Sequence, residues 1–180
     1  MQAAQTAPYS QILEYLITAI SRPQRVEGVD AFQAHDSLQI NLLSCLLEQN
    51  SRLCDMTRSL PADVWPQLKA RQSMAAEADY IVCNGYYFPA FEPRNNPTFT
   101  TDRAATILVQ VDRLGSGDQR LSLSGPGIEG DCDIELEGLH PAWMEKRRDW
   151  NRAGLQGVDM LLFDRSQILA LPRTTNVIEP

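Results

Sequence analysis

Apolar residues recur every three or four positions through the first part of the chain. Over Tyr9–Ser21 this spacing predicts an amphipathic helix, which Pro23 ends. The same spacing predicts a second helix over Asp36–Asn50, with Asp36 as a plausible N-cap. A third helix is predicted over Pro61–Arg71, because proline suits the first helical position.

Apolar runs of strand length follow these helical segments. Tyr80–Cys83 is predicted to be a strand. Thr106–Val111 and Leu121–Ser124 lie on either side of Gly115–Asp118, which is rich in turn residues. This arrangement predicts a hairpin made of the two runs.

A second hairpin is predicted near the end of the sequence. Two apolar runs, Gly157–Phe163 and Ile168–Leu171, are joined by a short polar turn at 164–167. Between the two hairpins, Glu145–Asp149 carries interleaved acids and bases and is expected to be an exposed helix face. Helices mixed with at least five strands predict an α/β layered domain with a mixed sheet.

Composition limits the class of protein. A chain of 180 residues with 43% hydrophobic content is expected to form one domain over residues 1–180. No apolar run approaches the roughly 20 residues that span a bilayer. The net charge of −7 argues against a nucleic-acid partner, which basic residues would have to attract. Because residues 1–8 do not resemble a secretory signal, we expect a cytoplasmic protein.

A cationic motif follows the last hairpin. Pro172 ends the apolar run, and Arg173, Thr174 and Thr175 follow it as hydrogen-bond donors. A guanidinium beside two hydroxyls suits phosphate or phosphonate oxygens. The alternative is a structural tie, in which a carboxylate such as Asp159 pairs with Arg173.

A glycine-containing motif ends an earlier strand. In Ser124–Gly127, the amides of Gly125 and Gly127 can approach an anion closely, but the same residues also suit a tight turn. Since this motif and the Arg173 motif both end strands of one expected sheet, we expect them to lie together and to shape one polar concavity.

The segment Asn84–Pro97 combines prolines with aromatic residues. Tyr86, Tyr87, Phe88 and Phe91 either cover an apolar patch or form a contact surface for a partner, and both interpretations remain open.

Other reactive side chains give no catalytic pattern. Cys45, Cys54, Cys83 and Cys132 lack the spacing of a metal site or disulfide framework and are interpreted as buried thiols. His35 and His140 stand apart from any metal motif and are interpreted as structural, so no metal site is predicted. From the residues alone, no reaction can be named.

The order of the motifs is more specific than any one of them. In series they resemble the PhnH family, the H subunits of the bacterial carbon–phosphorus lyase system. The resemblance rests on Ala105–Val111, Leu123–Ile128, Gly157–Asp159 and Leu171–Thr175, and more weakly on Ala19–Pro23. Gln24 departs from the family, which has glycine there, and residues 154–156 replace an aromatic–proline pair.

The resemblance implies a three-layer α/β/α sandwich like the large domain of pyridoxal-phosphate transferases, in a family not known to use that cofactor. It also implies a subunit, itself without an assigned catalytic residue, of a complex that couples an alkylphosphonate to the ribose of ATP and releases adenine. A homodimer when isolated, and G-, I- and J-type subunits as partners, are the expected assemblies. The alternative is a transferase-like enzyme that binds a phosphonate or nucleotide phosphate through the Arg173 region.

Overall fold

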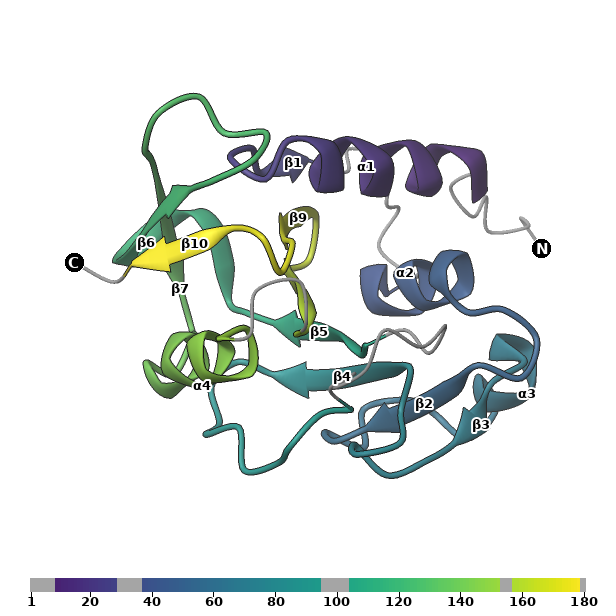
Figure 1. The fold of residues 1–180 in the computed structure, drawn as a ribbon. Helices are drawn as coiled ribbons and strands as arrows, with labels where there is room; N and C mark the ends of the chain where they lie inside the picture. Colours follow the sequence, from purple (N-terminus) through teal and green to yellow (C-terminus); the bar gives the residue numbers. More distant parts are fainter. Residues whose placement is uncertain (1–8, 29–36, 95–103, 153–156, 179–180) are drawn as a thin grey trace.

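The computed structural model describes residues 9–28, 37–94, 104–152 and 157–178, which form two sheets and four helices (Figure 1). The helices are α1 (Tyr9–Ser21), α2 (Leu38–Leu46), α3 (Trp65–Leu68) and α4 (Ala142–Trp150). The larger sheet has seven strands in the order β1-β9-β8-β5-β4-β2-β3, and the smaller has three in the order β10-β6-β7. None of the described helices is both long and apolar enough to cross a membrane.

The larger sheet is mixed, as the sequence predicts. Its parallel part consists of β3 (Arg71–Gln72), β2 (Arg52–Asp55), β4 (Tyr80–Asn84), β5 (Thr106–Gln110) and β8 (Asp159–Phe163). Antiparallel to β8 runs β9 (Gln167–Leu171), which pairs in turn with β1 (Glu27–Gly28). The expected α/β fold with a mixed sheet is therefore confirmed.

Alternate residues of the central strands serve two separate cores. In β5, Ile107 and Val109 face a core that includes α4, whereas Leu108 faces a core shared with α1 and α2. All three side chains are buried, as expected for a parallel strand covered on both faces. The layer beside α4 also contains the smaller sheet, made of β6 (Arg113–Ser124), β7 (Cys132–Glu137) and β10 (Asn176–Ile178), so one outer layer is part helix and part sheet.

The helices agree with the sequence to different degrees. The first prediction is confirmed, since α1 spans Tyr9–Ser21. The second helix is shorter than predicted. It begins at Leu38, with Ser37 at the N-cap position, whereas the predicted N-cap Asp36 lies outside the described residues. It ends at Leu46, because the backbone of Leu47 is already extended. The third prediction was wrong over most of its length, because α3 is a single turn that ends at Lys69 in a left-handed conformation (φ 54°).

The first predicted hairpin was wrong. Thr106–Gln110 does not pair with Leu121–Ser124; it lies between β4 and β8 in the larger sheet, whereas β6 pairs with β7 and β10. The physical reason is burial: β5 is apolar on both faces, and a two-stranded hairpin would leave one of those faces in water.

The second predicted hairpin is confirmed. Strands β8 and β9 pair from Met160↔Leu171 to Phe163↔Ile168. Buried Asp164 fixes the turn: its Oδ1 accepts hydrogen bonds from the backbone N–H groups of Ser166 (2.8 Å) and Gln167 (2.7 Å). Its Oδ2 accepts a third, from the backbone N–H of Leu114 at the start of β6 (2.9 Å), so one carboxylate ties both sheets together.

Candidate functional site

The two polar motifs singled out in the sequence lie side by side. The link from β9 to β10 contains Arg173, Thr174 and Thr175, and β10 then pairs with the end of β6 in the register Asn176↔Ser124. At Gly125 the backbones approach closely: a Cβ atom there would lie 2.9 Å from the carbonyl oxygen of Thr174. The predicted proximity of the motifs is confirmed, but the prediction that they end strands of one sheet was wrong, because β9 belongs to the larger sheet and β6 to the smaller one. The shared polar concavity remains a prediction.

The glycines in this loop serve contacts within the protein. Gly125 (φ +131°) allows the approach to Thr174, and Gly127 (φ +81°) lies against the end of α1, where a Cβ atom would be 3.3 Å from the carbonyl oxygen of Ser21. Gln24, which departs from the family pattern, holds the same loop by accepting a hydrogen bond from the backbone N–H of Glu129 (3.0 Å). The loop is therefore built as a packed turn.

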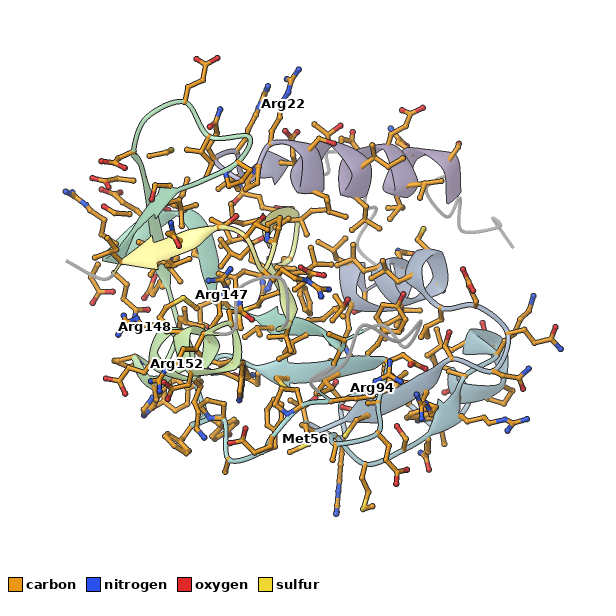
Figure 2. The ribbon with its side chains drawn as sticks, viewed as in Figure 1. Arg22, Met56, Arg94, Arg147, Arg148 and Arg152 are labelled. Atoms are coloured by element: carbon orange, nitrogen blue, oxygen red, sulfur yellow. The ribbon has the colours of Figure 1, made fainter. Side chains whose placement is uncertain are left out.

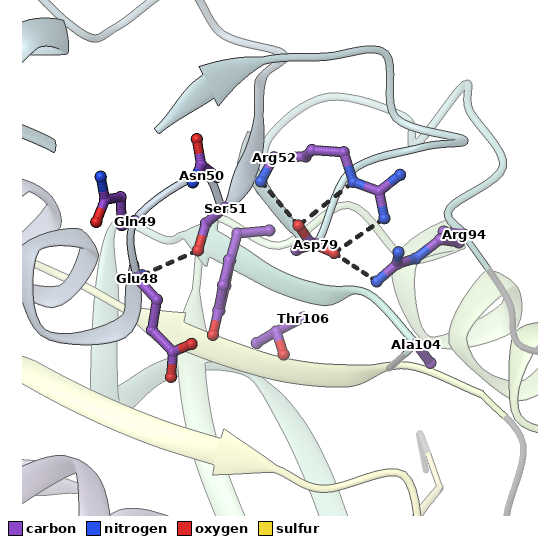
Figure 3. A pocket seen from close by; sticks show the side chains of 10 residues that line it. Glu48, Gln49, Asn50, Ser51, Arg52, Asp79, Arg94, Ala104 and Thr106 are labelled. Carbon is purple, nitrogen blue, oxygen red and sulfur yellow. Dashed lines mark hydrogen bonds and ion pairs between the residues drawn. The ribbon is translucent and has the colours of Figure 1, made fainter. Parts of the chain in front are cut away.

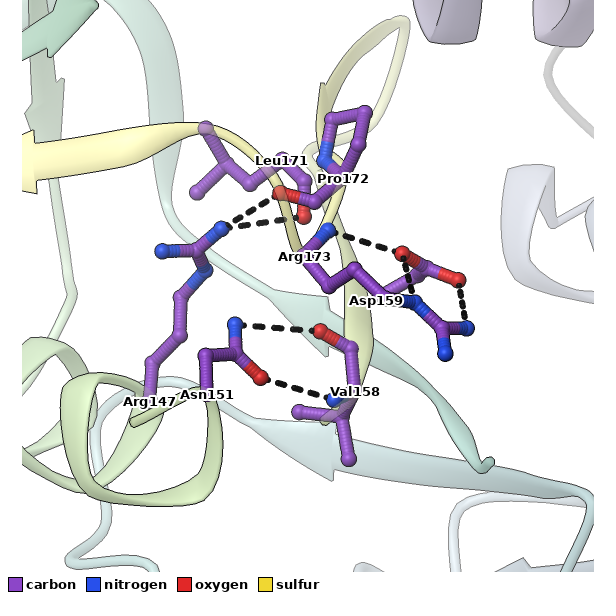
Figure 4. Close-up of polar contacts among 7 residues, drawn as sticks. All are labelled: Arg147, Asn151, Val158, Asp159, Leu171, Pro172 and Arg173. Carbon is purple, nitrogen blue, oxygen red and sulfur yellow. Dashed lines mark hydrogen bonds and ion pairs between the residues drawn. The ribbon is translucent and has the colours of Figure 1, made fainter. Parts of the chain in front are cut away.

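Arg173 is paired with Asp159, the carboxylate named as its structural partner (Figure 4). The guanidinium donates through Nη2 to Oδ2 (2.6 Å) and through Nε to Oδ1 (3.2 Å), and the backbone N–H of Arg173 also donates to Oδ1 (2.8 Å). The hydrogen bond that Arg173 donates to Asp159 raises the pKa of Arg173. The geometry is that of a structural tie between the start of β8 and the end of β9.

Arg147 is the residue of this region that the sequence interpretation missed. The segment Glu145–Asp149 is predicted to be an exposed helix face, and Glu145, Arg148 and Asp149 are exposed, but only 3% of the Arg147 surface is accessible. Arg147 lies on the side of α4 that faces the link between β9 and β10 (Figure 2). Its Nη2 donates to the carbonyl oxygens of Pro172 (2.7 Å) and Leu171 (3.4 Å). Burial lowers the pKa of Arg147 to about 10, and the charge of Asp159 opposes that shift. The sequence contains a signal for this burial, because the spacing of Trp143, Arg147 and Trp150 places them on one face of a helix. In the structure both tryptophans on that face are buried.

The two threonine hydroxyls differ in their surroundings. Thr174 is exposed, whereas Thr175 is buried and its Oγ1 has no hydrogen-bond partner within the described part of the chain. The backbone N–H of Thr175 donates to the carbonyl oxygen of Pro172 (2.9 Å), which also accepts from Arg147. One carbonyl thus joins α4 to the turn before β10.

The aromatic segment divides into a covering part and an exposed part. Phe91 packs against Trp143 and Trp150, with ring centroids 6.1 and 5.6 Å away, as expected for a cover over an apolar patch. The residues Tyr86, Tyr87 and Phe88 are 68, 66 and 54% exposed. The covering interpretation therefore holds for Phe91, whereas partner contact remains a prediction for Tyr86, Tyr87 and Phe88; Asn95–Pro97 lie outside the described residues.

A second polar cluster, at the amino ends of the parallel strands, was also missed (Figure 3). Asp79 accepts hydrogen bonds from Arg52 at its backbone N (2.8 Å), Nε (3.4 Å) and Nη2 (3.2 Å), and from Nη2 of Arg94 (2.6 Å). Burial raises the pKa of Asp79, but the bonds from Arg52 and the charges of both arginines outweigh it, so the pKa lies below its usual value. Asp79 stands directly before the predicted strand that begins at Tyr80, which is a sequence signal for one member of this cluster; β2, which begins at Arg52, was not predicted.

The depressed pKa of Asp79 gives a pH prediction. A carboxyl group whose pKa is lower in the folded protein stabilises it above the unfolded pKa, and this contribution disappears as the pH falls through the folded value. We expect Asp79→Asn to reduce the free energy of unfolding at neutral pH, and this difference from the wild type to shrink below about pH 4. Urea denaturation at a series of pH values measures this. Asp63→Asn, at an exposed position, is the control, and a pH-independent loss in Asp79→Asn would contradict the prediction.

The cysteines, Lys146 and His140 are buried, partly buried or in contact with neighbouring groups. Cys54 and Cys83 are buried and Cys45 and Cys132 partly so, and burial raises the pKa of the Cys45, Cys54 and Cys83 thiols. Nζ of Lys146 contacts Oε1 of Glu92 at 2.7 Å. His140 accepts a hydrogen bond from the backbone N–H of Ala142 through Nδ1 (3.2 Å), and His35 lies outside the described residues.

Comparison with known proteins places the chain in a family. A family model described as "Bacterial phosphonate metabolism protein (PhnH)" matches residues 3–178. A Stutzerimonas stutzeri protein named putative C-P lyase subunit protein HtxG is 30% identical over 162 residues, which cover 90% of this chain and 82% of that protein. The alpha-D-ribose 1-methylphosphonate 5-triphosphate synthase subunit PhnH of Rhizobium meliloti (strain 1021) is 38% identical over 79 residues, 42% of this chain and 38% of that protein. Because the family model spans nearly the whole sequence, the chain belongs to the PhnH family of bacterial phosphonate metabolism proteins.

Proposed function

We propose that this chain is a non-catalytic subunit of the carbon–phosphorus lyase assembly, needed where an alkylphosphonate is coupled to the ribose of ATP with release of adenine. Two relatives are named as subunits of such systems. The observation that carries the proposal is the exposed aromatic surface formed by Tyr86, Tyr87 and Phe88. Aromatic residues dominate the energetics of many protein interfaces. We propose that this surface binds G-, I- or J-type subunits in the cytoplasm.

The backbone beneath this surface is held in place from both sides. Nε1 of Trp143 donates to the carbonyl oxygen of Tyr87 (2.9 Å), and the backbone N–H of Gly85 donates to the carbonyl oxygen of Gln110 (2.7 Å). Further along, Glu92 accepts hydrogen bonds from Nζ of Lys146 (2.7 Å) and Nε1 of Trp150 (2.9 Å). Because the backbone is already ordered, a partner would bind without the cost of ordering a loop.

Several features support a subunit without activity of its own. Protonated thiols are poor nucleophiles, and burial raises the pKa of Cys54 and Cys83. A Schiff-base lysine needs a sheltered amine with a lowered pKa, whereas Lys69 is exposed and Lys146 pairs with Glu92. The competing function, a transferase-like enzyme acting through Arg173, is less favoured because Asp159 occupies that guanidinium. The likeness to pyridoxal-phosphate transferases remains a prediction from the family resemblance.

Replacing Tyr86, Tyr87 and Phe88 together with serine is expected to abolish co-purification of the tagged chain with its partner subunits. These side chains are exposed, so the variant should still fold, while interface anchors of this kind each contribute about 2 kcal/mol or more. Co-expression with the partner subunits, followed by affinity purification and quantification of the partners, measures the effect.

The chain offers a matched control for this experiment. Leu13, Ile17 and Ile20 form an exposed apolar stripe on α1, so their triple serine variant removes a similar amount of apolar surface elsewhere. If the α1 variant loses the partners and the aromatic variant keeps them, the aromatic surface is not the docking site.

We also propose that the isolated chain is a homodimer. Light scattering on the wild type and on both variants tests this proposal, and a wild-type mass of 20.2 kDa, that of the monomer, would refute it.

A further inference from the structure

The parallel strands of the larger sheet reverse their order at β2. Along the chain they follow one another as β2, β3, β4, β5 and β8, but in the sheet they stand in the order β3-β2-β4-β5-β8. The chain therefore places β3 on one side of β2 and all the later parallel strands on the other. In open α/β sheets, ligands bind beyond the carboxyl ends of the strands at such a switch point.

A cavity of about 440 Å³ lies at the carboxyl ends of β2 and β3, which run side by side at one edge of the sheet next to α3 (Figure 1). The last three residues of β2, Leu53–Asp55, line it together with Gln72 of β3 and Ser73, which follows β3. Its volume is within the range of small-molecule sites. All the residues that line it belong to the described part of the chain.

Part of the cavity wall is apolar. Leu53 and Leu60 are buried, and Trp65, the first residue of α3, is partly buried on the same wall. The other tryptophans, Trp143 and Trp150, lie in the core beside α4 and are only 1 and 5% exposed. Such a wall suits the apolar body of a ligand, and Trp65 is the tryptophan that a ligand in the cavity would contact.

The carboxylate of Asp55 is occupied by the loop that follows β2. Its Oδ1 accepts hydrogen bonds from the backbone N–H (3.2 Å) and the Oγ1 hydroxyl (2.8 Å) of Thr57, and its Oδ2 accepts one from the backbone N–H of Leu60 (2.9 Å). Arg58 stands between these contacts, in a left-handed conformation (φ 51°), and lines the cavity. Asp55 thus fixes the loop that presents Arg58.

The polar groups that remain on the wall are mainly hydrogen-bond donors. Arg58 is exposed and forms no ion pair within the part of the chain that the structure describes. Among the same residues, the Oγ of Ser73 is buried without a hydrogen-bond partner. The exposed side chain of Gln72 adds an amide. A guanidinium, a hydroxyl and an amide on one cavity suit an oxyanion.

We infer that this cavity binds a small organic anion, with its oxyanion at Arg58 and Ser73 and its apolar body against Trp65. A bare inorganic anion would leave the apolar wall in contact with water, and an uncharged apolar molecule would leave the guanidinium unpaired. Carboxylates and phosphonates share the required chemistry. The inference depends on the cavity and its place in the sheet, and not on the proposed subunit function.

Isothermal titration calorimetry of the full chain with four probes tests this inference. Phenylphosphonate and benzoate carry both an oxyanion and an apolar body, whereas methylphosphonate lacks the body and benzyl alcohol lacks the charge. We expect saturable binding of phenylphosphonate or benzoate, and binding of methylphosphonate and benzyl alcohol at least about tenfold weaker. The tighter of the first two identifies the oxyanion. Tryptophan emission should change on binding, because Trp65 lines the cavity.

Two variants assign the contacts. Arg58→Asn removes the cation and keeps a residue that tolerates a positive φ, so it should lower the affinity for phenylphosphonate to that for benzyl alcohol. Ala62→Phe, at an exposed position on the cavity wall, should fill the cavity and block every probe. Arg22→Met removes an exposed arginine after α1 and is the control, with binding unchanged (Figure 2). Circular dichroism verifies that each variant folds.

Two results would overturn the inference. Binding of no probe, or binding that neither Arg58→Asn nor Ala62→Phe weakens, would show that the cavity is not a ligand site. Equal affinities for phenylphosphonate and methylphosphonate would show that the apolar wall contributes nothing, and the assignment of an organic anion would be wrong. Neither result bears on subunit docking, which the Tyr86, Tyr87 and Phe88 variant tests separately.

Discussion

Replacing Asp159 with asparagine is expected to lower the free energy of unfolding substantially. Asp159 accepts three hydrogen bonds from Arg173, and its charge also favours the ionised form of buried Arg147. The variant would remove the carboxylate that binds Arg173 and whose charge favours ionised Arg147. Breaking a buried ion pair costs roughly 3–5 kcal/mol, but the Asp159 side chain is 37% exposed, so we expect about 2–3 kcal/mol. Urea denaturation at neutral pH measures the change.

The same substitution at Asp149 provides the control. Asp149 also pairs with an arginine, Arg152, at 2.7 Å, but both side chains are largely exposed, at 59 and 81%. Its replacement should change stability by less than about 1 kcal/mol.

Arg173→Ala, like Asp159→Asn, should lower the melting temperature, and growth on phosphonate should fall only as far as folded protein is lost. If Arg173→Ala leaves stability intact and abolishes growth, Arg173 serves a ligand or partner and the structural interpretation is wrong.

Gly125→Ala is expected to be the most damaging glycine substitution in the candidate site. Its φ of +131° is a conformation that side chains rarely adopt, and the new methyl group would lie 2.9 Å from the carbonyl oxygen of Thr174. Backbone strain of this kind costs about 1–3 kcal/mol, and the contact would also push β10 away from β6. Thermal and urea denaturation should both show a loss of about 3 kcal/mol or more.

Gly130 separates the two contributions. It also has a positive φ (+75°), but a Cβ atom there would meet nothing within 4 Å. Gly130→Ala should therefore cost only the backbone strain, about 1 kcal/mol. Equal losses in the two variants would mean that the approach of Gly125 to Thr174 contributes nothing.

Sequence patterns predicted those elements whose signal is local. The helical spacing over Tyr9–Ser21 and the turn between β8 and β9 were enough, because each is defined by residues close together in the chain. The pairing of Thr106–Gln110 could not be predicted in this way, because an apolar run followed by glycines looks the same whether its partner is the next strand or a distant one. Strand β2 was missed because Arg52–Asp55 is too short to show a period.

The candidate site follows the same division. Asp159 could be named as the partner of Arg173, and the meeting of Gly125 with the Arg173 motif could be expected, because all three stand at strand ends. The contact of Arg94 with Asp79 could not be expected, since 15 residues separate them and no periodicity links them. That contact depends on how the segment after β4 returns to the edge of the sheet.

The pairing of β1 with β9 has a consequence for how the protein loses its structure. Glu27 and Gly28, early in the sequence, complete the sheet edge beside Ile168 and Gln167, late in the sequence. Any division of the chain between these two strands breaks at least this ladder, and a division between β4 and β5 breaks two. Neither half of the sequence therefore contains all the strands that pair with its own strands. We expect a destabilising change at one end of the sheet to lower the stability of the whole cooperative unit, rather than of a part that unfolds alone.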